Sequence, residues 1–118
     1  MAELPAISRD ELRRKIDHGE QLVLVDALAP MSFAHSHLPG AINLPPEWVD
    51  DRGPARIPDR NAEIVVYCAS ETCDSSVQVG ERLFELGYPN VLHYVEGKKG
   101  WVEAGLPVEG GGVRLKGS

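Results

Sequence analysis

Two uninterrupted apolar runs, residues 22–25 (LVLV) and 64–67 (IVVY), constrain the possible folds of this chain more than any other feature. A strand with one face in water alternates apolar and polar side chains, whereas a strand covered on both faces is apolar throughout. The two runs therefore predict strands of a parallel sheet with helices on both sides. Together with two weaker segments they give predicted strands at residues 21–26, 41–44, 63–68 and 91–95.

Helix signals lie before and between these strands. Ser8 followed by Glu11 has the spacing of an N-terminal capping box, and Gly19 ends the helix that it predicts. Further helices are predicted at residues 31–35, for one turn from residue 46, and at residues 76–86. Alternating strands and helices in 118 residues predict one α/β domain, an open sheet of about five mainly parallel strands with helices on both faces. We expect this domain to span residues 1–109 and residues 110–118, which begin with three glycines, to form a flexible tail.

Charge and hydropathy exclude several classes of function. The chain has 18 acidic and 12 basic residues, and this net charge of −6 disfavours binding to nucleic acid or to an anionic membrane. The apolar runs fall far short of the roughly 20 residues that span a bilayer. The first five residues, MAELP, do not resemble a signal peptide, so we expect a cytoplasmic protein. Two cysteines do not make a disulfide scaffold, and in a reducing compartment a cysteine is more often catalytic, metal-binding or buried.

A parallel sheet of this kind places its site beyond the carboxyl ends of its strands. Four segments leave those ends here, residues 26–31, 45–48, 68–75 and 96–100. In the third, a buried strand runs into Cys68, a polar loop and then a helix. Loop and helix N–H groups stabilise a thiolate, which makes Cys68 a candidate nucleophile, although a strand-end cysteine can also be a small buried side chain.

The loop sequence narrows the chemistry. Cysteine phosphatases need an Arg six residues after the nucleophile, where this chain has Asp74. Four residues separate Cys68 from Cys73, so the pair is not a Cys-x-x-Cys motif. Sulfur transfer remains, because it requires a thiolate and N–H donors. The predicted binding residues are those of the loop and two lysines beyond the last strand: Ala69, Ser70, Glu71, Thr72, Cys73, Asp74, Ser75, Lys98 and Lys99.

Three stretches resemble the rhodanese-like superfamily over residues 6–109. The strand ending at Asp26 is followed by HLPGAIN at residues 37–43, IVVYC precedes the cysteine, and YVEGKKGWVEAGLPVE closes the domain. The resemblance implies a five-stranded, mainly parallel sheet and a persulfide carried by Cys68. The chain departs from the family at Leu28 and Ser32, where Arg and Glu are common, and at Glu96, where Gly is usual.

The loop is also unusual in its charge. It has no basic residue, and it contains Glu71 and Asp74, which oppose a dianionic donor such as thiosulfate. Lys98 and Lys99 either restore positive potential or form a solvated turn. Cys73 is either a second thiol that resolves an oxidised Cys68 or a loop cysteine out of reach, since a disulfide requires Cα atoms within about 7 Å.

These observations predict a sulfurtransferase that moves a sulfane sulfur from a small-molecule donor to a thiol or cyanide through a Cys68 persulfide. A sulfur-relay protein is a further candidate partner. No cofactor is required, and the histidines match no zinc motif; His37 and His93 are predicted to be structural. The alternative is a non-catalytic rhodanese-like module that binds a partner or senses redox state through Cys68 and Cys73.

Overall fold

The protein is described by a computed structural model that covers residues 4–70 and 72–110. Five strands form one sheet in the order β1-β5-β4-β2-β3, and every pairing is parallel. The predicted open α/β sheet is therefore confirmed. The strands are β1 (Ala6–Ile7), β2 (Val23–Asp26), β3 (Ile42–Asn43), β4 (Ile64–Tyr67) and β5 (Val91–Tyr94).

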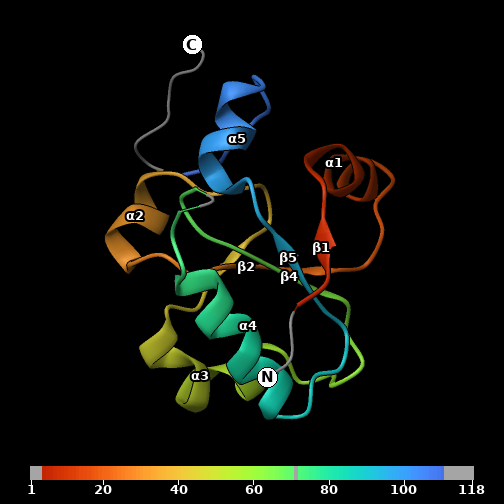
Figure 1. The fold of residues 1–118 in the computed structure, drawn as a ribbon, viewed down its shortest axis with the longest axis vertical. Coiled ribbons are helices and arrows are strands. Elements are labelled where there is room, and N and C mark those ends of the chain that lie inside the picture. The colour runs from red at the N-terminus through yellow and green to blue at the C-terminus, as the bar shows by residue number, and fades with distance from the viewer. Residues whose placement is uncertain (1–3, 71, 111–118) are drawn as a thin grey trace.

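Helices cover both faces of this sheet, with α3 and α4 on one side and α1 and α5 on the other (Figure 1). Their bounds are α1 (Arg9–Asp17), α2 (Pro30–His35), α3 (Val49–Arg56), α4 (Ser75–Glu85) and α5 (Gly97–Glu103), and a short 3-10 helix, η1 (Pro46–Trp48), precedes α3. In the described part of the chain, no helix is both long enough and apolar enough to span a bilayer.

The two central strands contribute side chains to two separate cores. Val25, Ile64 and Val66 pack with α3 and α4, while Leu24 and Val65 face the opposite way and pack with α1 and α5. Successive residues of a strand point to opposite faces. Each residue of the LVLV and IVVY runs is therefore placed against helices on one side or the other, which explains why these runs do not alternate.

The structure corrects some predicted elements. The fifth strand is Ala6–Ile7, which pairs with His93 and Tyr94 of β5; the four apolar runs used for prediction did not include it. The single turn expected at Pro46 continues into α3, although this helix contains Pro54. Residues 97–103, where no helix was predicted, form α5.

Both ends of the predicted domain pack against it. Ser8 caps α1 by accepting a hydrogen bond from Glu11 N, as predicted. At the other end, His37 and Glu109 exchange backbone hydrogen bonds of 2.8 Å, and Gly110 lies so close to His35 that a Cβ atom would be 2.6 Å from its carbonyl oxygen. The rest of the predicted tail, residues 111–118, lies outside the described residues.

Candidate active site

Cys68 directly follows β4, the central strand of the sheet, and stands at its carboxyl end. The main chain around it is fixed by the start of α5, because Lys98 N donates to Cys68 O (2.9 Å) and Lys99 N donates to Ala69 O (2.8 Å). Gly97 makes this approach possible. It has a φ of 71°, and a Cβ atom there would lie 2.7 Å from Cys68 O.

The loop between Cys68 and α4 leaves several N–H groups free. Cys73 N donates to Ser70 O (3.1 Å), whereas the amides of Ala69, Ser70 and Thr72 have no acceptor among the described residues. The loop leads into the N-terminus of α4 at Ser75, where the helix dipole is positive. Free amides and a helix N-terminus are the groups that stabilise a sulfur anion. Glu71, a predicted binding residue, lies outside the described residues.

The two cysteines are joined as a disulfide, with their Cα atoms 6.2 Å apart. This distance meets the geometric condition that the sequence could not test. In this oxidised form Cys68 is 1% exposed, so its sulfur is closed to a donor. Cys73 lies at the rim of the loop and is partly exposed.

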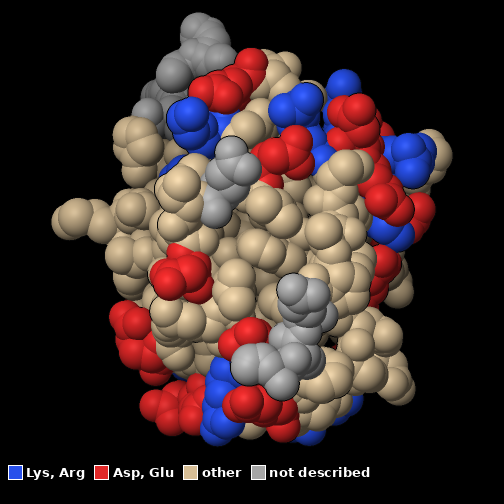
Figure 2. Space-filling model, viewed as in Figure 1, with Lys and Arg blue, Asp and Glu red and all other residues tan. Residues whose placement is uncertain are grey.

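A cavity of about 400 Å³ adjoins the loop. Its charged side chains are two cations and two anions, and they are paired: Arg9 lies 3.9 Å from Glu96, and Lys99 lies 3.3 Å from Glu103. Acidic and basic groups are interspersed over this end of the molecule, around α1 and α5 (Figure 2). The lining residues are Arg9, Ser70, Thr72, Glu96, Lys99, Gly100 and Glu103.

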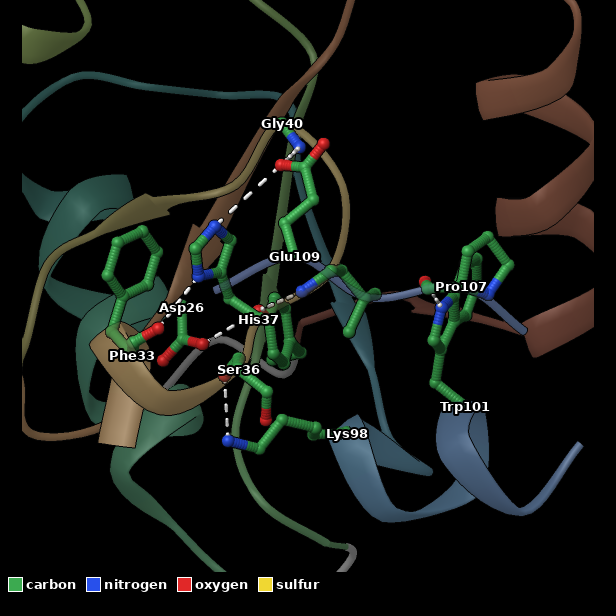
Figure 3. A network of polar contacts seen from close by, with 11 residues as sticks. Asp26, Phe33, Ser36, His37, Gly40, Lys98, Trp101, Pro107 and Glu109 are labelled. Carbon is green, nitrogen blue, oxygen red and sulfur yellow. Dashed lines mark hydrogen bonds and ion pairs between the residues drawn. The ribbon is translucent and has the colours of Figure 1, made fainter. Parts of the chain in front are cut away.

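The two predicted lysines have different surroundings. Lys99 lines the cavity and is exposed, whereas the Lys98 ammonium group donates to Ser36 O (2.9 Å) and approaches Ser32 O (3.5 Å) near the end of α2 (Figure 3). Burial lowers the pKa of Lys98, and the nearby Asp26 charge partly opposes this shift. The Lys98 side chain therefore ties α5 to α2.

Behind the loop, Asp26 and Tyr67 form a buried polar pair. The Tyr67 hydroxyl donates to Asp26 Oδ2 (2.7 Å) and accepts from Leu38 N (3.0 Å), while Leu28 N donates to Asp26 Oδ1 (2.9 Å). Burial raises the pKa of Asp26, and the bonds from Tyr67 and Leu28 partly oppose this. Tyr67 immediately precedes Cys68, so this pair anchors the strand end that carries Cys68.

The signature residue His37 has a structural position, as predicted. Its Nδ1 atom lies 2.7 Å from Phe33 O, its ring stacks on Phe33 with centroids 3.8 Å apart, and its Nε2 atom lies 3.8 Å from Glu109 Oε1 (Figure 3). His93 also has the structural setting predicted for it, because its Nε2 atom lies 2.9 Å from the buried Ser76 hydroxyl of α4.

Sequence reasoning missed two residues of this site. Arg9 reaches the cavity from the start of α1 and donates to Gly100 O (3.3 Å), but in the sequence it is one basic residue among several. Gly97 did have a signal, because it stands in the closing stretch that resembles the family.

Comparison with known proteins decides the family. The rhodanese-like domain family matches residues 8–104. The chain belongs to this family. It is 30% identical to a sulfurtransferase from Allochromatium vinosum over 86% of this chain and 92% of that protein. It is 34% identical to the thiosulfate sulfurtransferase GlpE from Haemophilus influenzae over 74% of this chain and 79% of that protein.

Solved structures share the fold. The BH2092 protein from Bacillus halodurans superposes with a TM-score of 0.83 at 22% identity, covering 90% of this chain and 77% of that one. Some curated relatives are longer, and the chain spans 45% to 62% of their length. This rhodanese-like domain is thus related both to proteins of its own size and to parts of larger proteins.

Proposed function

We propose that this rhodanese-like protein is a cytoplasmic sulfurtransferase whose nucleophile is Cys68. The observation that carries the proposal is the position of Cys68 at the end of the central strand, before a loop whose described amides at Ala69, Ser70 and Thr72 have no acceptor. Such amides stabilise negative charge on sulfur in the same way that an oxyanion hole stabilises oxygen. The relatives named as sulfurtransferases, at 30% and 34% identity, support the same chemistry.

The reaction begins from the reduced protein. The Cys68 thiolate attacks the outer sulfur of a sulfane donor, a sulfur–sulfur bond of the donor breaks, and the rest of the donor leaves with the electron pair. Cys68 then carries a persulfide. A thiolate or cyanide acceptor attacks the outer sulfur, and the Cys68 thiolate is restored. The chemistry requires no metal or organic cofactor.

Charge in the cavity favours donors with little negative charge. Arg9 and Lys99 are each paired with a glutamate, and Asp74 lies on the loop, so no unpaired cation of the cavity attracts a dianion. We therefore propose that a neutral or singly charged persulfide or polysulfide is a better donor than thiosulfate. A like charge near the nucleophile costs on the order of 1 kcal/mol.

Intact mass spectrometry tests the function directly. The protein is fully reduced, freed of reductant and incubated with inorganic polysulfide or with thiosulfate. We expect the Cys73→Ser variant, which cannot form the disulfide, to gain one sulfur atom that cyanide removes, faster with polysulfide than with thiosulfate. Cys68→Ser should gain no sulfur, because the nearly isosteric hydroxyl is not a comparable nucleophile, and circular dichroism should show an unchanged fold.

The alternative function makes a different prediction. A module that binds a partner or senses redox state through Cys68 and Cys73 would lose two hydrogens on oxidation and release no hydrosulfide, and its Cys73→Ser variant would gain no sulfur from either donor. That result would reject the sulfurtransferase proposal and favour the alternative.

A further inference from the structure

Cys73 is held where it can react with Cys68. The hydrogen bond from Cys73 N to Ser70 O (3.1 Å) holds Cys73 close to Ser70, two residues beyond Cys68 at the end of β4. The Cα atoms of the two cysteines are 6.2 Å apart, and the structure contains the bond between their Sγ atoms.

The two cysteines differ in how firmly they are held. The main chain of Cys68 is fixed by β4 on one side and by Lys98 N on the other. Cys73 lies on the outer part of the loop, two residues before α4 begins, and is partly exposed. A partly exposed thiol can meet an external reductant, whereas the sulfur of the buried Cys68 is closed to one while the disulfide is intact.

We propose that Cys73 is a second catalytic residue, a resolving thiol that reduces the Cys68 persulfide and releases its sulfur as hydrosulfide. This inference rests on the proposed sulfurtransferase function and adds the fate of the sulfur. The atom that Cys73 meets in the structure is Cys68 Sγ, which is the inner sulfur of the persulfide. Attack on the outer sulfur would instead move the persulfide to Cys73.

The step balances without an added oxidant. The Cys73 thiolate attacks Cys68 Sγ, a bond forms between the two cysteine sulfurs, and the bond from Cys68 Sγ to the outer sulfur breaks. The outer sulfur, which carries the proton of the protonated persulfide, leaves with the electron pair as hydrosulfide, so the sulfane sulfur is reduced and the cysteine pair is oxidised to the disulfide. Hydrosulfide is a weaker base than an alkyl thiolate, which makes it a good leaving group.

Turnover then requires a dithiol reductant. One thiolate of the reductant attacks the sulfur of the partly exposed Cys73 and releases the Cys68 thiolate, and the second resolves the mixed disulfide and releases Cys73. The reductant leaves as its own disulfide, and its two protons remain with the products. Because Cys73 lies on the same chain, it has the kinetic advantage of an intramolecular nucleophile over a dilute external thiol.

A single-turnover experiment without added thiol tests this role. Reduced protein is loaded briefly with inorganic polysulfide, separated from it by rapid gel filtration, and followed by intact mass and by a hydrosulfide assay. We expect the unmodified protein to release about one equivalent of hydrosulfide and to end with two hydrogens fewer than the reduced protein. Cys73→Ser should keep the added sulfur and release hydrosulfide at least about tenfold more slowly.

Two further variants make the result decisive. Cys73→Ala should behave like Cys73→Ser, and circular dichroism excludes a folding defect in either. Cys68→Ser should neither gain sulfur nor release hydrosulfide. A stable persulfide on the unmodified protein, or equal hydrosulfide release from Cys73→Ser, would overturn the resolving role and leave the sulfurtransferase proposal intact. Absence of any sulfur gain by reduced Cys73→Ser, together with no hydrosulfide release from the unmodified protein, would overturn both.

Discussion

Tyr67 and Tyr94 are register partners at the ends of β4 and β5, and both side chains are fully buried, yet their hydroxyl groups differ in hydrogen bonding. The Tyr67 hydroxyl bonds to Asp26 and to Leu38 N, whereas the Tyr94 hydroxyl has no partner among the described residues. Burial raises the pKa of Tyr94 to about 12, so the group is a neutral phenol at physiological pH. One tyrosine anchors the nucleophile strand through its hydroxyl, and the other contributes its ring to the core.

Matched Tyr→Phe substitutions should separate these roles. Tyr67→Phe removes a donor from the buried Asp26 carboxylate and an acceptor from Leu38 N, and we expect a loss of about 1–3 kcal/mol in the free energy of unfolding. Tyr94→Phe removes a hydroxyl without a described partner and should change stability by no more than about 0.5 kcal/mol. Urea unfolding measures both, and equal losses would contradict the difference in hydrogen bonding.

The two lysines of α5 should also differ in how much they contribute to stability. Lys98→Gln weakens the bonds to the carbonyl oxygens of Ser32 and Ser36 and should lower stability by about 1 kcal/mol. Lys99→Gln should leave stability unchanged, because its ion pair with Glu103 is exposed.

For thiosulfate kinetics we expect the opposite order, with Lys99 contributing more than Lys98. Lys99→Gln leaves Glu103 uncompensated in the cavity, so kcat/KM for thiosulfate should fall several-fold, with a smaller effect at high salt. Lys98→Gln should change it less, provided that both variants are assayed where they are fully folded. Urea unfolding and thiosulfate kinetics of the two variants check the stability prediction and the kinetic prediction together. A larger kinetic effect of Lys98→Gln than of Lys99→Gln would contradict the placement of Lys99 in the cavity.

His93 should make folding stability depend on pH. Burial lowers the pKa of His93 below its ordinary value of 6.5. The unfolded chain therefore takes up this proton first as the pH falls. The stability present above pH 6.5 is lost as the pH drops through 6.5 toward the lower pKa of the folded protein.

Protonation of Asp26 changes folding stability in the opposite direction, at lower pH. Burial raises its pKa above 3.8, so the folded protein binds that proton first and acidification there favours folding. The His93 contribution is isolated as the difference between the unmodified protein and His93→Gln, in urea unfolding at several values between about pH 5 and 8. We expect this difference to shrink as the pH falls, and a constant difference would mean that His93 titrates alike in both states.

The strands, and the position of Cys68 at the end of one of them, could be predicted because their signals are local. The apolar runs gave β2 and β4 to within two residues at either end, and a cysteine at the end of such a run indicated the site. The two-residue strand β1 gave no periodic signal, because its place is set by pairing with β5, nearly 90 residues away. Helix α3 was missed beyond its first turn because Pro54 argues against a helix, although Val49 and Gly53 bury one face of it against the core.

Long-range geometry explains what the sequence could not decide about the site. Whether Cys73 reaches Cys68 depends on how the loop curls, and whether Lys98 faces the cavity depends on where α2 ends. On α4, likewise, the predicted range did not say which side chains are buried: Ser76, Val79, Gly80 and Leu83 form the buried face, and Phe84 is exposed.

Gly97 offers the sharpest test of how the fold positions the nucleophile, because Gly105 provides a matched control. Both have a left-handed φ, 71° and 76°, but a Cβ atom at Gly97 would meet Cys68 O at 2.7 Å, whereas one at Gly105 would meet nothing within 4 Å. Gly105→Ala should cost about 1–2 kcal/mol from backbone strain alone. Gly97→Ala should add about 1–3 kcal/mol for the steric clash.

The two alanine variants should differ more in activity than in stability. At Gly97 the added methyl group pushes α5 away from the loop and weakens the bond from Lys98 N to Cys68 O, so the nucleophile shifts relative to the loop amides. In the Cys73→Ser background, which retains the added sulfur, we expect Gly97→Ala to gain sulfur from polysulfide about tenfold or more slowly than the parent variant, and Gly105→Ala to gain it at the parent rate. Both rates come from intact mass over time, at a temperature where urea unfolding shows each variant to be folded. Equal rates for the two variants would mean that the contact between α5 and Cys68 does not position the thiolate.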